Sequence, residues 1–229
     1  MAPRHNTVFL DLPLMRIDPE RMHQAMQYWQ PRWESLPRPL TAVMIGGPTD
    51  PYRMDVPVIR DLLAKVENLS AGGSLYISTS RRTPEAVINY LQLHKPANGM
   101  IYIWQADDPE NPYLGLMGLA DQFMVTGDSL SMMVEISRLG KPLAIYALPR
   151  QRGVLLPAAR WVLRQLRRLP GDWSGRFFGY GRDLERIHNY LLEQGLATTP
   201  EQPFKYPEVA VDTRFQELVS RIRGLLDNA

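Results

Sequence analysis

The fold of this protein is decided by residues 122–148, which read QFMVTGDSLSMMVEISRLGKPLAIYAL. Two short apolar runs, 122–127 and 142–148, have the length and the β-branched or aromatic content of buried strands. Between them, residues 129–140 carry apolar side chains at helical spacing and end in a glycine. A strand, a helix and a strand in direct succession predict a βαβ unit with parallel strands and a right-handed crossover.

The same alternation extends toward the N-terminus. Strand-like runs lie at 41–47, 73–80 and 99–105, and helical periodicity occupies 56–69, 81–94 and, briefly, 111–120. Thr83 and Pro84 are typical of an N-cap and a first helical position. The sequence therefore predicts an α/β fold, a Rossmann-like parallel sheet flanked by helices, over residues 41–148.

Two further segments surround this core. Residues 1–40 form an N-terminal extension and linker, with a strand candidate at 7–12 and a helix candidate at 18–33. Residues 149–229 are predicted to be C-terminal helices that pack on the core. Their helical patterns lie at 156–169, 181–195 and 212–226.

Composition excludes several classes of protein. The chain has no cysteine, which rules out disulfides, thiolate catalysis and cysteine-based metal sites. Its N-terminus lacks the apolar region of a signal peptide, and no run of about 18 apolar residues is present. A net charge of +2 gives no field for nucleic acid, and we expect a cytoplasmic protein without a nucleic-acid partner.

Polar residues follow the ends of the predicted strands. In open parallel sheets ligands bind outside the carboxyl ends of the strands, where glycines and helix N-termini offer N–H groups to an anion. The candidates for phosphate binding by this reasoning are Gly46, Gly47, Arg53, Arg81 and Arg82. The glycines could equally form a simple turn, and the adjacent arginines could be a solvated pair. The acidic loop with Asp107, Asp108 and Glu110 is typical of an exposed loop, so we expect no metal and no cofactor.

Glu135 lies on the first turns of the helix that follows the fourth strand. From there its carboxylate can point toward the start of the helix, where it would suit a vicinal diol such as a ribose. The alternative is a surface glutamate that the helix dipole stabilises. Ser129 and Ser131 precede it and are candidates for capping the helix.

The motifs together resemble a known family. GGPTDPYRMD (46–55), TSRRTP (79–84) and ENPYLGLMGLADQFMVTGDSLSMMVEISRLGKP (110–142) are similar, in that order, to the elongated-mitochondria (mitochondrial fission, ELM-type) family. Bacterial members of that family are usually described as glycosyltransferases. The pattern Glu135-x4-Gly140-x-Pro142 is also similar to the donor-site helix of the peptidoglycan lipid N-acetylglucosaminyltransferase.

The resemblance implies the C-terminal half of a GT-B fold, which binds a nucleotide-sugar donor. Glu135 would then hold the ribose. The donor's phosphates would lie against Asn111, Asp128, Ser129 and Ser131, beside the glycines and arginines named above. If the protein is catalytic, it would transfer the sugar to an acceptor without a metal.

Typical members carry a further Rossmann-like domain before the segment that matches this chain. We therefore expect activity to need a missing N-terminal domain or a partner subunit. Plant members are linked to mitochondrial fission through recruitment of a dynamin-related protein. The alternative function is thus a non-catalytic adaptor that uses the GT-B-like half as a docking surface.

Two features stand apart from this site. Arg160, Arg164, Arg167 and Arg168 recur at helical spacing, and a basic amphipathic helix of this kind either lies on an anionic membrane surface or is a solvated face. Of the histidines, His5, His94 and His188 are expected to be surface or partly buried structure. His23 is the candidate for a general base.

Overall fold

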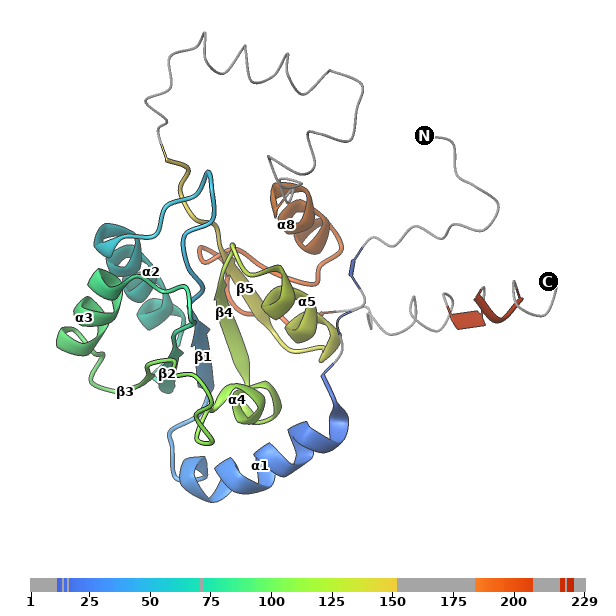
Figure 1. The fold of residues 1–229 in the computed structure, drawn as a ribbon, viewed down its shortest axis with the longest axis horizontal. Helices are drawn as coiled ribbons and strands as arrows, with labels where there is room; N and C mark the ends of the chain where they lie inside the picture. Colours follow the sequence, from blue (N-terminus) through green and yellow to red (C-terminus); the bar gives the residue numbers. More distant parts are fainter. Residues whose placement is uncertain are drawn as a thin grey trace, which may run out of the picture.

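A computed structural model of the 229-residue chain describes residues 12–13, 15, 17–70, 72–151, 184–207, 219–220 and 222–224. Its centre is a five-stranded sheet of order β3-β2-β1-β4-β5 in which every neighbouring pair is parallel (Figure 1). The strands are β1 (Leu40–Met44), β2 (Ser74–Ser78), β3 (Gly99–Tyr102), β4 (Gln122–Thr126) and β5 (Leu143–Tyr146). The sequence-based prediction of a Rossmann-like parallel sheet is confirmed.

Helices cover both faces of the sheet, as right-handed crossovers on either side of β1 require (Figure 1). They are α1 (Pro19–Trp33), α2 (Val56–Leu69), α3 (Glu85–Leu93), α4 (Tyr113–Leu119), α5 (Leu130–Arg138) and α8 (Leu184–Glu193). One apolar core lies between the sheet and α2 and α3, and a second lies between the sheet and α1, α4, α5 and α8.

Helix α2 shows how apolar spacing and an N-cap residue in the sequence produce a buried helix. Its apolar side chains at helical spacing are buried against the sheet, and the Asp55 carboxylate accepts a hydrogen bond from the Val58 N–H at 3.2 Å. This cap satisfies one of the N–H groups that a helix leaves unpaired at its start. The cap fixes the residue at which the helix begins.

The prediction that Thr83 caps the next helix, α3, is wrong. Helix α3 begins at Glu85 with Pro84 as N-cap, and no side chain caps it. The Thr83 hydroxyl instead donates to the Gly46 carbonyl at 2.7 Å and accepts from the Ser80 N–H. Because that hydroxyl joins two strand-end loops, it is not available to the helix.

The N-terminal helix packs on α4 through glycines. A Cβ at Gly115 would meet the Trp29 ring at 2.3 Å, and one at Gly118 would meet Met26 Cγ at 2.3 Å. Trp29 also stacks on Trp33, with ring centroids 4.7 Å apart. The segment expected as an extension therefore contributes its helix to one of the two cores.

The chain after α8 returns to the sheet. Thr198 lies beside β5, where Ile145 N–H donates to the Thr198 carbonyl at 2.9 Å and Thr198 N–H donates to the Leu143 carbonyl at 2.8 Å.

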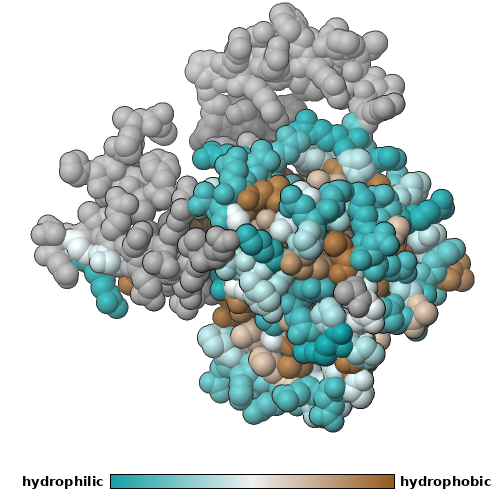
Figure 2. All heavy atoms as spheres, turned by 180° about the vertical axis from the view of Figure 1, so that it is seen from behind, coloured by the Kyte–Doolittle hydropathy of each residue, from teal (hydrophilic) through white to brown (hydrophobic). Residues whose placement is uncertain are grey.

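On the face of the molecule shown in Figure 2, hydrophobic residues are interspersed among hydrophilic ones. None of the described helices has the length and hydropathy needed to cross a bilayer.

Several sequence-based expectations lie outside the described residues. They are the strand candidate up to residue 11, His5, the helix at 156–169 with its four arginines, and most of the last helix at 212–226.

Candidate functional site

Strands β1 and β4 are central neighbours that belong to the two opposite halves of the sheet, so the strand order reverses between them. In open α/β sheets this switch point, at the carboxyl ends of the strands, is where ligands bind. Three loops meet there: Gly46-Gly47 after β1, residues 79–83 after β2, and residues 127–129 between β4 and α5.

Asp128 joins these loops from within. Its side chain is fully buried, with 0% exposed area. One carboxylate oxygen accepts from the Gly47 N–H at 2.9 Å and from the Arg82 guanidinium at 2.8 Å, and the other accepts from the Thr126 hydroxyl at 2.7 Å. The Thr126 oxygen in turn accepts from the Gly46 N–H at 2.8 Å. The charge is buried but fully hydrogen-bonded, as a charge inside a protein must be.

Gly46 and Gly47 are required by this close approach. A Cβ at Gly46 would lie 2.2 Å from an Asp128 carboxylate oxygen, and one at Gly47 would lie 2.3 Å from the Arg82 carbonyl oxygen. The two glycines therefore let the loop after β1 lie directly against its neighbours. Their backbone N–H groups bond to side chains of the protein itself, Thr126 and Asp128.

The arginines separate into different environments. The Arg82 guanidinium bridges Asp128 and the Thr49 hydroxyl, at 2.7 Å from the latter, while 42% of its side chain stays exposed. Arg81 is exposed. Arg53 lies in another loop and pairs with Asp55 at 2.8 Å. Of the three predicted arginines, the structure brings Arg82 to the switch point.

Helix α5 begins at the same edge. Ser129 is its N-cap residue and is buried, but no side chain makes a cap hydrogen bond. Ser131, also a predicted cap, lies half-buried in the first turn. An uncapped start leaves the first-turn N–H groups and the positive end of the helix dipole at the site.

Glu135 faces helix α4, where a second cluster forms. Its Oε2 accepts a hydrogen bond from the Tyr113 hydroxyl at 2.5 Å. Burial, and then the Glu135 charge, raise the pKa of Tyr113 well above its usual range, so the phenol stays protonated. Asn111 prepares this contact because its side-chain oxygen accepts from the Tyr113 N–H at 3.0 Å.

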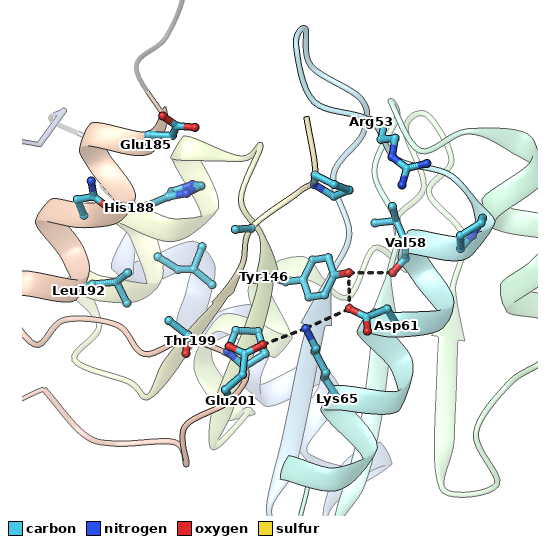
Figure 3. A pocket seen from close by; sticks show the side chains of 16 residues that line it. Arg53, Val58, Asp61, Lys65, Tyr146, Glu185, His188, Leu192, Thr199 and Glu201 are labelled. Carbon is cyan, nitrogen blue, oxygen red and sulfur yellow. Dashed lines mark hydrogen bonds and ion pairs between the residues drawn. The ribbon is translucent and has the colours of Figure 1, made fainter. Parts of the chain in front are cut away.

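A cavity of about 560 Å³ lies beyond β5, between α2 and α8 (Figure 3). The Tyr146 hydroxyl donates to Asp61 at 2.7 Å, and Lys65 pairs with Asp61 at 3.1 Å and with Glu201 at 2.9 Å. Burial and the Asp61 contact raise the pKa of Tyr146, while the Tyr146 hydrogen bond lowers the pKa of Asp61. Arg53 and Lys65, which line this cavity, each pair with a carboxylate of the protein.

His188 connects this cavity with the switch point. It is 9% exposed, and its Nε2 lies 2.7 Å from the Gly127 carbonyl oxygen, to which only a protonated nitrogen can donate. Burial lowers its pKa. The sequence-based expectation for His188 is surface or partly buried structure, whereas the structure places it among the buried polar residues. His23, the candidate base, instead bonds Gln27 on α1 at 3.0 Å.

Sequence reasoning gave no place in the site to Thr126, Tyr113 or His188. His188 had a signal, because it shares a helix face with Leu184 and Leu191, both buried. Tyr113 and Thr126 gave none beyond their place in the quoted motifs. No group of three or more histidines and carboxylates in the described ranges could hold a metal ion.

The sequence of this chain matches a known protein family. The family model for mitochondrial fission ELM1 matches residues 2–156, which include every strand of the sheet and both clusters of the site. The chain belongs to the mitochondrial fission ELM1 family.

Two curated relatives of this family member can be compared over part of their length. The chain is 32% identical over 144 residues to the mitochondrial fission protein ELM1 of Arabidopsis thaliana, covering 62% of this chain and 34% of the relative. It is 36% identical over 113 residues to the uncharacterized protein RP120 of Rickettsia prowazekii (strain Madrid E), covering 48% of this chain and 32% of the relative. The chain thus spans about a third of the length of these relatives.

Among solved structures, the chain is similar to the wall teichoic acid polymerase TagF. One TagF structure, a variant soaked with CDPG, has a TM-score of 0.35 at 14% identity and covers 75% of this chain and 41% of TagF. Another variant structure has a TM-score of 0.37 at 13% identity and covers 92% and 50%.

Proposed function

We propose that this chain is the donor-binding half of a GT-B-like glycosyltransferase and binds a nucleoside diphosphate sugar at the switch point between β1 and β4. One observation carries the proposal. The strand-end loops, the Arg82 guanidinium and the uncapped start of α5 converge at one edge of a parallel sheet, where nucleotides bind in such folds.

The diphosphate would lie against the start of α5. Backbone N–H groups of the first turn and the Ser129 and Ser131 hydroxyls would donate to it, and Arg82 and Arg81 would supply charge. Asp128 carries a negative charge, but Arg82 already pairs with that charge, and the Gly47 N–H and the Thr126 hydroxyl donate hydrogen bonds to it. In this proposal Asp128 shapes the phosphate site and holds Arg82 in place.

The ribose would lie near Glu135, about one and a half turns further along α5, on the side of α4. Asn111 contributes indirectly, because it fixes the backbone of Tyr113. Arg53 belongs to the cavity beside α8, where an acceptor or a partner subunit would approach.

Transfer of the sugar would need no metal in this scheme. The helix dipole and the arginines would stabilise the negative charge that develops on the departing diphosphate, which is electrostatic catalysis. A further domain or a partner subunit would supply the acceptor and the general base.

Calorimetric titration with UDP, GDP, ADP, CMP and their sugars tests the proposal. We expect one nucleotide to bind at micromolar concentration, and Glu135→Ala to weaken it at least tenfold, which is about 1.4 kcal/mol. Glu85→Ala is the matched control, since Glu85 is also an early helical glutamate but lies on α3. Equal weakening by both variants would refute a ribose role for Glu135.

A second candidate function is favoured by one feature of the same site. The Asp128 carboxylate already occupies the Gly47 N–H and the Arg82 guanidinium, which are groups that a phosphate would use. A relative in this family is named as a mitochondrial fission protein. A non-catalytic adaptor would show no nucleotide binding across the panel, and would retain a protein partner in a pull-down when Arg82 is changed to alanine.

Peripheral membrane contact is a separate part of the proposal. Arg160, Arg164, Arg167 and Arg168 recur in the sequence at helical spacing, which would put them on one face of a helix. Cosedimentation with anionic liposomes, compared with a variant in which all four are glutamine, tests this contact.

A further inference from the structure

The contact between Tyr113 and Glu135 joins two crossover helices on the same face of the sheet. Tyr113 is the first residue of α4, and Glu135 lies in the second turn of α5. Their side chains meet at 2.5 Å between the phenol oxygen and Oε2. Both residues are partly buried, so solvent competes only weakly for this hydrogen bond.

Tyr113 can act only as a donor in this contact. Burial is the main cause that raises its pKa, and the Glu135 charge raises it further, so the hydroxyl keeps its proton. The donor is also fixed in position, because Asn111 holds the Tyr113 backbone and the preceding Pro112 is buried. Glu135 therefore meets a rigid donor rather than a mobile side chain.

A rigid donor on one oxygen constrains the whole carboxylate. A glutamate that is free at three side-chain torsions pays conformational entropy when it orders around a ligand. With Oε2 tied to Tyr113, the plane of the carboxylate is set before a ligand arrives, and Oε1 is the oxygen that can accept from ligand hydroxyls. Such preorganisation increases affinity mostly by reducing the cost of ordering.

We infer that Tyr113 is a positioning residue that holds Glu135 to accept the ribose hydroxyls, and that the pair makes the site select ribonucleotides over 2′-deoxyribonucleotides. This inference rests on the proposed function, because it needs a nucleotide at the start of α5. It adds the class of sugar that the nucleotide must carry.

The test compares UDP, GDP, ADP and CDP with their 2′-deoxy forms by calorimetry. The proteins are the wild type, Tyr113→Phe, Glu135→Gln and the double variant. Tyr102→Phe is the matched control, since the Tyr102 hydroxyl donates to the Asp108 carboxylate at 2.9 Å in another tyrosine–carboxylate pair. Circular dichroism and a urea midpoint check that each variant folds.

We expect Tyr113→Phe to weaken the ribonucleotide about fivefold, within the range of coupling between contacting residues. The 2′-deoxy form keeps only the 3′-hydroxyl, so Tyr113→Phe should weaken it less than the ribonucleotide. In the Glu135→Gln background the effect of Tyr113→Phe should disappear, and Tyr102→Phe should leave all affinities unchanged.

Equal weakening of both sugar classes, no weakening, or an effect that persists without Glu135 would each overturn the inference while leaving nucleotide binding intact. A wild type that binds no nucleotide would refute the proposed function first, and the inference with it. If Tyr113→Phe fails to fold, Glu135→Asp replaces it, because the shorter side chain withdraws the carboxylate from the phenol. That variant should lose the same preference for ribose.

Discussion

The packing of Gly46 against Asp128 makes a quantitative prediction about stability. The three atoms that a Cβ at Gly46 would meet first all belong to the Asp128 carboxyl group, the nearest at 2.2 Å. Gly46→Ala must therefore push a buried carboxylate out of its hydrogen bonds, which we expect to cost about 3 kcal/mol of unfolding free energy.

The compensating change is Asp128→Ala. By itself it leaves the buried Gly47 N–H and Thr126 hydroxyl without their acceptor, at about 1–3 kcal/mol for each group, so we expect about 3 kcal/mol. In the double variant the new methyl group occupies space that the carboxylate has vacated. The total should then be close to that of Asp128→Ala alone, with a coupling of about 2–3 kcal/mol.

Gly47 provides the matched control. A Cβ there would meet the backbone carbonyl oxygen of Arg82 at 2.3 Å and the Arg82 Cβ at 2.4 Å. Because Arg82→Ala retains both atoms, it cannot relieve the overlap. The effects of Gly47→Ala and Arg82→Ala should add to within about 0.5 kcal/mol.

Urea unfolding of the wild type, the four single variants and the two double variants measures these values, with the slope compared between variants. Additive losses for Gly46→Ala and Asp128→Ala would refute the claim that this glycine exists to admit the carboxylate. Strong coupling between Gly47→Ala and Arg82→Ala would refute the claim that Gly47 contacts atoms of Arg82 that the alanine retains.

Two further predictions concern the opposite end of the sheet and the N-terminal helix. Burial lowers the pKa of Lys141 to about 8, well below the usual value for a lysine, and its Nζ donates to the Gly118 and Ala120 carbonyls at 2.6 Å. Above about pH 8 the Lys141 amine is still protonated in the unfolded chain but is losing its proton in the folded protein. The free energy of unfolding should therefore rise from about pH 7.5 to about pH 9.5, and Lys141→Met should flatten that rise. An unchanged rise in the variant would contradict this prediction. On α4, Gly115→Ala should cost about 2–3 kcal/mol and Gly118→Ala about 1 kcal/mol, because the first meets the stacked Trp29 ring and the second a flexible methionine. Equal losses in urea would contradict that difference.

The elements of the fold could be predicted because their signals are local. Strands such as β4 are buried on both faces and therefore appear as short apolar runs. Helices such as α2 show apolar side chains at the spacing of one helix face. The right-handed crossover rule then leaves few ways to order five parallel strands, so the α/β sheet follows from the sequence alone.

Contacts at the site depend on residues that are far apart in the chain. Gly47 and Asp128 are separated by 81 positions, and His188 bonds to Gly127 across 61 positions. The spacing of apolar residues along the sequence carries no information about contacts between residues so far apart. The sequence therefore identified Gly46, Gly47, Arg82 and Asp128 as polar or flexible strand-end residues, but not that they bind one another.

What the sequence by itself determined is the Rossmann-like sheet and the helix that carries Glu135, and it predicted the edge where a ligand would bind. Only the tertiary structure decided that the Asp128 carboxylate turns inward to Gly47 and Arg82, and that Tyr113 holds Glu135. The physical reason is that backbone preference and apolar spacing act over a few residues. The direction of a buried polar side chain is instead set by whichever partners the packed sheet brings within hydrogen-bonding distance.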